Sequence, residues 1–325
     1  MASIGYSMLC EQRSPTDLVR DAISAEQAGF DFLTISDHYH PWVEAQGHSP
    51  NAWVTLGAVA RATDRVELMT MVTAPTIRYH PAIVAQQAAT MALLAGGRFT
   101  LGLGAGEQLN EHVVGRGFPP VTIRHEQLSE AVEIIQELLA GGYLTYQGEH
   151  YNVSDAKLFD RPETPIPVGI AVSGPESCRL AGEMADLAIA TEPKASLVRD
   201  FAEAGGAGKP VYGQLAVCWG PDEAKCRALA REQFAWSLLG WKVMAELPNT
   251  RNFEAATRFM HEVDVAELIP CGVELEPIVE AARRYVDAGF THLALVQIGP
   301  DQEEFCELFS ERLGPELRVL SNGNA

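Results

Sequence analysis

The chain has 325 residues, of which 47% are hydrophobic and 21% charged, so it can bury a large core and is neither disordered nor fibrous. Its 24 Lys and Arg residues against 43 Asp and Glu residues give a formal charge of -19. The basic residues form no stripe of the kind that neutralises phosphate backbones. We therefore expect neither nucleic acid nor an anionic membrane surface as a partner.

Residues 1–15 lack the basic start and the apolar run of a signal peptide, and no stretch reaches the roughly 18 apolar residues of a membrane span. The cysteines show no CxxC pair and no Cys/His pattern at metal-ligand spacing. The sequence therefore predicts a cytoplasmic protein without a metal site, with free thiols at Cys10, Cys178, Cys218, Cys226, Cys271 and Cys306.

Short β-rich segments alternate along the chain with longer segments of helical periodicity. The predicted strands are 4–9, 30–36, 66–72, 99–104, 168–172, 187–190, 211–219 and 292–298. The predicted helices are 15–28, 50–63, 81–96, 121–140, 175–185, 195–205, 221–246, 274–288 and 301–313. Several strands are almost continuously apolar, which is typical of strands covered on both faces in a parallel sheet. The pattern favours one (β/α)8 barrel domain over 1–325 rather than an open doubly wound sheet.

Three segments modify this simple alternation. LGLGAGE at 101–107 has GxGxG spacing, follows the fourth strand and is expected to lead into polar loop, so it is a weak dinucleotide-binding fingerprint. An insertion at 141–167 has alternating β-like pieces around Gly148 and predicts a small hairpin. A second insertion at 220–273 follows a strand, so we expect it over the C-terminal mouth as a lid or pocket wall.

Residues that follow different strands of a barrel share one mouth. SDHYHPW at 36–42 places Asp37, His38 and Trp42 there, which supplies a hydrogen-bonding carboxylate, a group that titrates near neutral pH and an amphipathic wall. Asp37 could instead only accept hydrogen bonds from loop amides. Glu107 comes directly after GAG at 104–106, where glycines let a ligand approach the backbone, and we expect it in the same space. A carboxyl in a dry pocket suits a general acid.

A predicted anion site follows the fifth strand. Ser173 and Gly174 precede a helix that Pro175 opens, so free amides and the positive end of the helix dipole meet there. A phosphate group would fit this position, although a plain helix cap fits equally well.

Several segments together resemble the coenzyme F420-dependent glucose-6-phosphate dehydrogenase group of the luciferase-like superfamily. They are SDHYHPW (36–42), TAPTIRYHPAIVAQQAATM (73–91), RFTLGLGAGEQLNE (98–111), the AVSGP turn and THLALVQIGPDQEEFCELF (291–309). The resemblance runs from about residue 4 to about 315 and is weakest over 220–273. It implies a homodimer of (β/α)8 barrels that bind F420, a phosphate-bearing 5-deazaflavin, at the C-terminal mouth. It also implies hydride transfer between a substrate carbon and C5 of the deazaflavin.

The resemblance also assigns roles to individual residues. The implied catalytic residues are His38, Glu107 and Trp42. The implied cofactor contacts are Asp37, Met71, Val72, Thr73, Gly106, Asn110, Ser173, Gly174 and Pro175, with a non-prolyl cis peptide at Met71–Val72 behind the ring. The implied substrate contacts are Glu11, Lys194 and Trp42.

One departure from the family concerns the substrate. The family's sugar-phosphate enzymes bind phosphate with two Lys and an Arg, whereas only Lys194 has a match here, and Ala255 and Leu268 take the other two positions. Each lost charge-assisted contact is worth about 1.5–3 kcal/mol. The same insertion carries Trp236, Trp241, Met244, Phe253 and Phe259, as pocket wall or as core. We therefore expect an uncharged alcohol or sugar, or its carbonyl counterpart, as substrate.

The sequence thus predicts an F420-dependent dehydrogenase or reductase. In this hypothesis His38 takes the hydroxyl proton as hydride leaves, Trp42 walls the pocket, and Glu107 exchanges a proton near the ring. The resemblance leaves open which of His38 and Glu107 is the base, because groups in one pocket titrate as a coupled pair. The alternatives are an FMN-dependent luciferase-like monooxygenase, an F420-dependent glucose-6-phosphate dehydrogenase proper and a non-catalytic cofactor-binding barrel.

Overall fold

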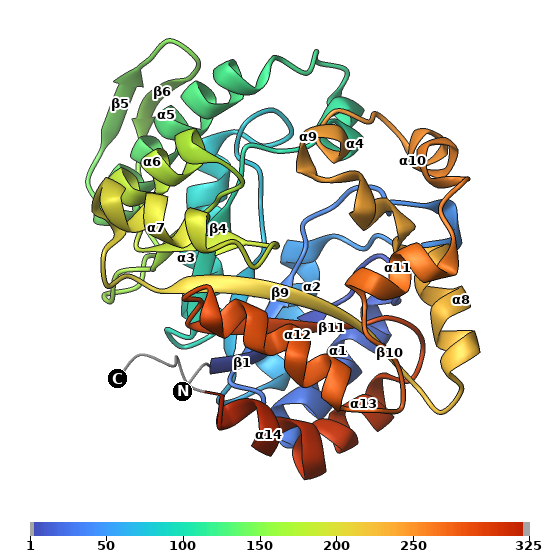
Figure 1. The fold of residues 1–325 in the computed structure, drawn as a ribbon. Helices are drawn as coiled ribbons and strands as arrows, with labels where there is room; N and C mark the ends of the chain where they lie inside the picture. The colour runs from blue at the N-terminus through green and yellow to red at the C-terminus, as the bar shows by residue number, and fades with distance from the viewer. Residues whose placement is uncertain (1–2, 321–325) are drawn as a thin grey trace.

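A closed barrel of parallel strands forms the centre of the computed structural model, which describes residues 3–320 (Figure 1). The barrel strands are β1 (Ser3–Met8), β2 (Phe32–Ile35), β3 (Glu67–Thr70), β4 (Phe99–Leu103), β7 (Val168–Ala171), β8 (Leu187–Ala190), β9 (Val211–Trp219) and β11 (His292–Gln297). Each pairs in parallel with its neighbours, and the β8–β9 pair closes the circle. The predicted (β/α)8 fold is confirmed, and every predicted strand is a barrel strand.

An outer layer of helices covers the barrel. It consists of α1 (Pro15–Ala28), α2 (Ala52–Ala62), α3 (Pro81–Leu94), α5 (Val121–Ala140), α6 (Pro175–Met184), α7 (Ala195–Phe201), α12 (Glu276–Asp287) and α13 (Gln302–Leu308). Local chemistry sets the ends of α1: the Ser14 side chain accepts a hydrogen bond from the Asp17 amide, and Gly29 ends the helix at φ 87°. The last helix of the described residues, α14 (Gly314–Arg318), was not among the predicted helices. Within residues 3–320, no helix is both long and apolar enough to cross a membrane.

Apolar side chains fill the barrel interior, including Phe32, Met69, Ile189 and Tyr212. Glycine makes room for them, since a Cβ on Gly5 would lie 2.4 Å from the Phe32 ring. A larger apolar cluster lies between the strands and the outer helices. The apolar interior and the apolar cluster outside the strands hold each strand in place. They therefore also position the residues that follow each strand.

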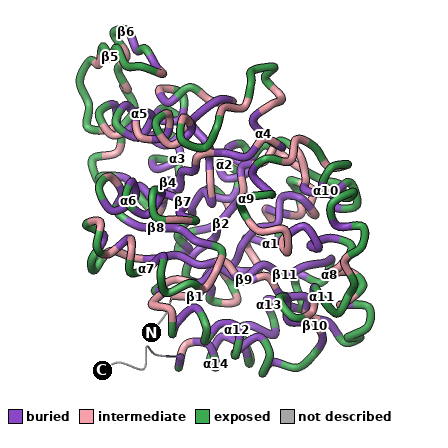
Figure 2. Tube along the Cα trace, turned by 45° about the horizontal axis from the view of Figure 1, so that its top comes forward, coloured by how far each residue is buried: buried purple, intermediate pink, exposed green. Residues whose placement is uncertain are grey.

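The insertion at 141–167 forms the predicted hairpin. Its strands β5 (Leu144–Gln147) and β6 (Asn152–Ala156) pair antiparallel, and Figure 2 shows them standing off the barrel with mostly exposed residues. The Glu130 carboxylate accepts hydrogen bonds from three amides at the hairpin tip. The Tyr151 hydroxyl donates to the Thr76 carbonyl at 2.7 Å, which ties the hairpin to the loop after β3.

The insertion at 220–273 differs from its prediction. The single helix expected over 221–246 is wrong, because the backbone leaves helical geometry at Phe234 and again at Gly240, whose φ is 72°. The segment instead contains α8 (Glu223–Phe234), a 3-10 turn (Ala235–Leu239), α9 (Trp241–Met244), α10 (Thr250–Thr257), α11 (Glu262–Leu268) and β10 (Cys271–Gly272). β10 pairs with the end of β9, which returns the chain to the barrel (Figure 1).

The polar loop expected after LGLGAGE is also wrong. The one-turn helix α4 (Gln108–Glu111) begins directly after Glu107, and a 3-10 turn (His112–Val114) continues it. A second 3-10 turn (Glu44–Gln46) follows the SDHYHPW segment. The glycine-rich segment still follows the fourth barrel strand, so it is no dinucleotide fingerprint.

Candidate active site

His38 lies between two buried carboxylates at the mouth of the barrel. Its Nδ1 is 2.5 Å from Glu11 Oε1, and its Nε2 is 3.3 Å from Glu107 Oε1. Glu11 follows β1, His38 follows β2 and Glu107 follows β4, so the barrel brings together residues from three distant parts of the chain. The result is an acid–imidazole–acid cluster, in which one ring nitrogen faces each carboxylate.

Burial and charge act in opposite directions on this cluster. Burial tends to lower the pKa of His38, but the charge of Glu11, its contact with the ring and the charge of Glu107 raise it above the ordinary value. Burial tends to raise the pKa of Glu11, yet the adjacent His38 and a 2.7 Å hydrogen bond from the Ser36 hydroxyl lower it. The pair therefore favours a carboxylate beside an imidazolium. Glu11 Oε2 is buried, and no group within residues 3–320 donates a hydrogen bond to it.

Asn110, on α4, is hydrogen-bonded both to the cluster and to the loop that carries His38. Its amide nitrogen donates to Glu107 Oε1 at 2.6 Å, and its Oδ1 accepts from the amides of Tyr39 and His40 at 2.7 and 2.9 Å. The side chain is 0% exposed. Asn110 thus holds Glu107 against the loop that carries His38, while its cofactor contact stays a prediction.

Trp42 forms the wall beside His38. The two rings meet edge to face at 5.1 Å, while Trp42 stacks on Trp236 at 4.3 Å and meets Phe253 edge to face at 5.2 Å. Aromatic pairs of this kind add about 0.5–1.5 kcal/mol beyond area burial. The insertion therefore supports the wall from behind.

The expected pocket aromatics of the insertion divide into two groups. Trp236, Met244 and Phe253 are buried in a separate apolar cluster with Trp42. Phe259 is 75% exposed and packs under the Arg258 guanidinium, and Trp241 is partly exposed. Of the two alternatives left open by the sequence, core therefore holds for three of the five residues.

A second set of ionic contacts lies beneath the mouth. Asp37 accepts hydrogen bonds from Trp53 Nε1 at 3.2 Å and Thr73 Oγ1 at 2.9 Å, and Arg78 lies 3.2 Å from it. Arg78 also lies 3.5 Å from Glu111, which accepts the Arg78 amide at 2.7 Å. Asp37 thus anchors the loops after β2 and β3, and its cofactor contact stays a prediction.

Sequence reasoning missed Arg78 and Glu111. Burial raises the pKa of Glu111 to about 7, against the lowering effect of Arg78, so this carboxyl titrates near neutral pH. A signal was present, since Glu111 lies four residues after Glu107 and therefore on the same face of a helical turn. Only the wrong prediction of loop after residue 107 hid it.

The loops after β3 and β4 pack closely against each other at two glycines. The Met71–Val72 peptide bond is cis, as the family resemblance implied. A Cβ on Gly104 would lie 2.6 Å from Val72 Cγ2, and Gly106 has φ 82° with no room beside Glu111. A side chain at Gly104 would collide with Val72, and one at Gly106 would collide with Glu111, so both positions require glycine. The contact of these loops with a cofactor ring stays a prediction.

The predicted anion site has two converging amides. The Ser173 and Gly174 amides donate to Ser177 Oγ at 3.0 and 3.2 Å, and that hydroxyl donates to the Gly174 carbonyl. Pro175 begins α6 directly after them. This geometry is a helix cap, and the expected free amides are wrong, because both donate to Ser177 Oγ. A phosphate would have to replace that hydroxyl, and phosphate binding stays a prediction. Lys194 lies elsewhere, exposed before α7 and paired with Glu192 at 2.8 Å.

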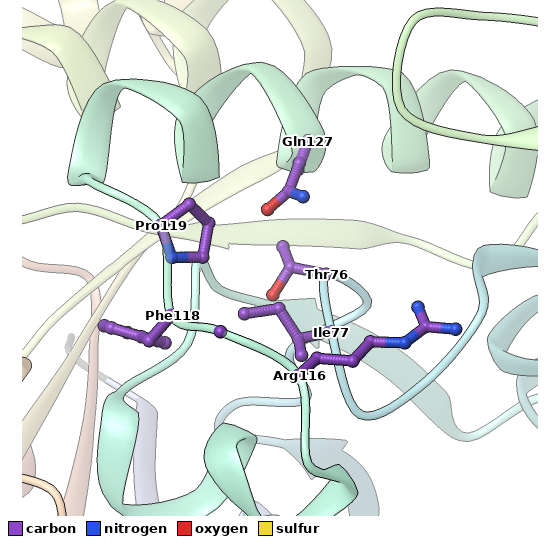
Figure 3. Close-up of a pocket in the computed structure, with 7 residues that line it drawn as sticks. Thr76, Ile77, Arg116, Phe118, Pro119 and Gln127 are labelled. Carbon is purple, nitrogen blue, oxygen red and sulfur yellow. The ribbon is translucent and has the colours of Figure 1, made fainter.

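A pocket of about 310 Å³ lies beside the loop after β3. Figure 3 shows Thr76, Ile77, Phe118, Pro119 and Gln127 around it, with Arg116 at its side. Neither the imidazole of the mouth nor its two carboxylates line this pocket. It is therefore separate from the acid–imidazole–acid cluster.

A closed α/β barrel with titratable groups at the carboxyl ends of its strands is the architecture of a barrel enzyme. Residues 3–292 match the luciferase-like monooxygenase family, and the chain belongs to this family. The resemblance that the sequence motifs indicated is confirmed.

Two curated relatives and two solved structures are similar to the chain over nearly its full length. The chain is 37% identical over 338 residues to the F420-dependent glucose-6-phosphate dehydrogenase of Microbacterium testaceum, with 97% of each chain covered. The enzyme of the same name from Beutenbergia cavernae is 37% identical over 333 residues, with 98% of each covered. A solved F420-dependent secondary alcohol dehydrogenase, in complex with an F420–acetone adduct, has TM-score 0.91 and 28% identity, covering 98% of this chain and 99% of that one. An F420-dependent tetrahydromethanopterin reductase from Methanopyrus kandleri shares the fold at TM-score 0.79 and 23% identity, covering 97% and 99%.

Proposed function

We propose that this chain, an F420-dependent oxidoreductase, transfers a hydride between coenzyme F420 and the hydroxyl- or carbonyl-bearing carbon of a small, uncharged organic substrate. The F420-dependent relatives and the solved alcohol dehydrogenase support the cofactor and the type of reaction. The observation that carries the site is the His38 imidazole between Glu11 and Glu107. A barrel that only binds a cofactor has no need of this proton-transfer group.

The mouth fits the cofactor in two places. The closely packed loops that carry Val72, Gly104 and Gly106 would support the flat ring, and the amides of Ser173 and Gly174 would bind its phosphate in place of Ser177 Oγ. Bound F420 supplies a carbon, C5, that accepts or gives up a hydride. The protein supplies orientation and the proton.

In alcohol oxidation the cluster accepts the hydroxyl proton. Glu11 stabilises the imidazolium that forms when His38 takes the proton, as the raised pKa of His38 indicates. Glu107, held by Asn110, serves the second proton at the cofactor side. In carbonyl reduction the same groups return these protons.

The charges around the mouth favour an uncharged substrate. The acid–imidazole–acid cluster contains two buried acids, Glu11 and Glu107. A third buried acid, Glu111, lies on the helical turn that follows Glu107. The buried cation beneath the mouth, Arg78, is already paired with Asp37 and Glu111. Lys194 is exposed away from the cluster and paired with Glu192. A phosphate dianion brought there would cost several kcal/mol unless a cation left its partner.

A glucose-6-phosphate dehydrogenase is the second candidate, because the curated relatives carry that name. The test compares kcat/KM for glucose 6-phosphate with a panel of neutral secondary alcohols and sugars at saturating F420. The proposal expects a neutral substrate to be turned over better. A higher kcat/KM for the phosphorylated sugar would favour the second candidate and make Lys194 part of a phosphate site.

The homodimer implied by the resemblance is part of the same proposal. Val54 on α2 is 75% exposed, and Leu93 and Leu94 on α3 are 47% and 40% exposed. These side chains give the two adjacent helices an apolar outer face. Sedimentation equilibrium tests this expectation. A cytoplasmic location stays a prediction.

A further inference from the structure

Cysteines that are distant in the sequence meet at the base of the insertion at 220–273. Cys218 is the penultimate residue of β9, Cys271 is the first residue of β10, and the two are paired directly across the parallel strands. Cys226 on α8 packs in the same apolar cluster, and its Sγ would lie 2.9 Å from a Cβ on Gly220. The Cys218 thiol has both others within hydrogen-bonding reach. All three are free thiols. Their spacing along the chain does not indicate that they converge.

The two paired thiols have different surroundings. Cys218 is 1% exposed and its thiol lies 3.6 Å from the Ile298 carbonyl, whereas Cys271 is partly exposed. The contact with Cys218 and the charge of Arg227 lower the pKa of Cys271, against the effects of burial and of the Glu223 charge. The Cys271 thiol itself donates to the Ile269 carbonyl at 3.3 Å. The contact with Cys271 and burial raise the pKa of Cys218. An accessible thiol near a guanidinium is the usual setting of a reactive cysteine.

The backbone places the pair within bonding range. Neighbouring strands lie about 4.8 Å apart, inside the Cα separation of about 4.4–6.8 Å that disulfides span. Cys218 lies two residues before the insertion begins, and Cys271 lies near its end, three residues after its last helix, α11. A bond between them would therefore close the insertion at its base (Figure 1).

We propose that Cys218 and Cys271 form a reversible redox pair that a peroxide oxidises to a disulfide. The Cys271 thiolate attacks one peroxide oxygen, the O–O bond breaks, and Cys271 becomes a sulfenic acid as the other oxygen leaves as water. The Cys218 sulfur then attacks the sulfenic sulfur, the S–S bond forms, and a second water leaves. The two thiols together lose two electrons and two protons, and the peroxide gains them.

The disulfide would hold the segment that supports the site. The insertion presents Trp236 and Phe253 to the back of Trp42. Cross-linking its two ends restricts the freedom of the whole segment. Oxidation at the base would thus act on the wall beside His38 without consuming a catalytic residue.

The test is mass spectrometry of the full-length protein after exposure to hydrogen peroxide and alkylation of the remaining thiols. We expect a species about 2 Da lighter than the reduced protein before alkylation, a peptide that links Cys218 to Cys271, and reversal by dithiothreitol. Cys226→Ser and Cys306→Ser are matched controls in which the link should persist. In Cys218→Ser, a sulfenic acid should accumulate at Cys271 and react with dimedone.

The outcomes are distinguishable. A link that uses Cys226, a link lost in Cys226→Ser, or oxidation of Cys271 to a sulfonic acid with Cys218 still reduced would overturn the proposal. If Cys218→Ser does not fold, the peptide map of the unmodified sequence decides, because it names both linked residues.

Discussion

The two nitrogens of His38 contact carboxylates with different surroundings. Glu11, on the Nδ1 side, is buried and fixed by Ser36, whereas Glu107, on the Nε2 side, is held by Asn110 at the start of α4. The Nδ1 contact sets the protonation of the ring, and the Nε2 contact keeps a second carboxyl within reach of the reacting groups. Glu11 is therefore a positioning and pKa-setting residue as well as a predicted substrate contact.

Replacing Glu11 tests this division. Glu11→Gln keeps the shape but removes the charge that raises the pKa of His38, so the pKa of His38 should fall. In alcohol oxidation the neutral imidazole is the active form, and the rising limb of kcat/KM against pH should move to lower pH. Glu254 is an exposed residue of α10, and Glu254→Gln is the control that should leave the pH profile unchanged. An unmoved limb in Glu11→Gln would show that another group produces it.

The same substitution should alter stability over a defined pH range. The raised pKa of His38 stabilises the fold below the ordinary value of 6.5, and this contribution is lost as pH rises through the folded value. The lowered pKa of Glu11 stabilises the fold above the ordinary value of 4.5, and this contribution is lost as pH falls through the folded value. Both contributions are present between pH 4.5 and pH 6.5, so Glu11→Gln should lower the free energy of unfolding most in this range. Urea titrations at several pH values would measure the loss.

Two further substitutions test the proton-transfer roles. His38→Ala and Glu107→Gln should each lower kcat by roughly 10²-fold or more, because such groups act mainly in the transition state. Affinity for F420, measured by fluorescence quenching, should stay within about tenfold. Near-normal turnover in either variant would remove that residue from the mechanism.

At the scale of elements, the insertion stabilises Trp42 through its core. Phe253→Ala removes a fully buried ring and should lower the free energy of unfolding by about 3–5 kcal/mol while raising KM, because Trp42 loses an edge contact. Phe259→Ala is the matched control, since that ring is 75% exposed, and it should change stability by less than about 0.5 kcal/mol. Equal effects of the two substitutions in urea denaturation would contradict the assigned packing.

The contrast between barrel and insertion shows what sequence patterns can predict. Barrel strands such as FDFLTIS are buried on both faces, and helices such as α1 and α5 have periodicity that local capping ends, so their positions followed from composition and spacing. The insertion instead bends at Phe234 and Gly240 to pack Trp236 on Trp42. That tertiary contact is invisible in the local pattern.

At the site, too, some residues could be predicted from the sequence and others could not. The strand-end rule and the family motifs singled out His38, Trp42 and Glu107, and the barrel brings all three together. The ionic contacts of Arg78 and the convergence of Cys218 with Cys271 depend on strand neighbours far apart in the chain. No spacing within the sequence encodes them.

At the scale of the whole molecule, the charge of -19 opposes an anionic cofactor. The short-range amides of Ser173 and Gly174 must overcome this repulsion, and salt screens the repulsion more than it screens a close contact. Affinity for F420 should therefore rise or stay level as sodium chloride increases. Fluorescence titrations at low and high salt measure this, and a steep loss of affinity would point to a basic patch as the binding surface.

The central claim is that this barrel mouth binds a 5-deazaflavin for hydride transfer. Parallel fluorescence titrations of the purified protein with F420 and with FMN test it most directly. The account predicts saturable quenching with F420 and none with FMN at the same concentrations. Saturable binding of FMN without binding of F420 would contradict it and favour a flavin-dependent monooxygenase.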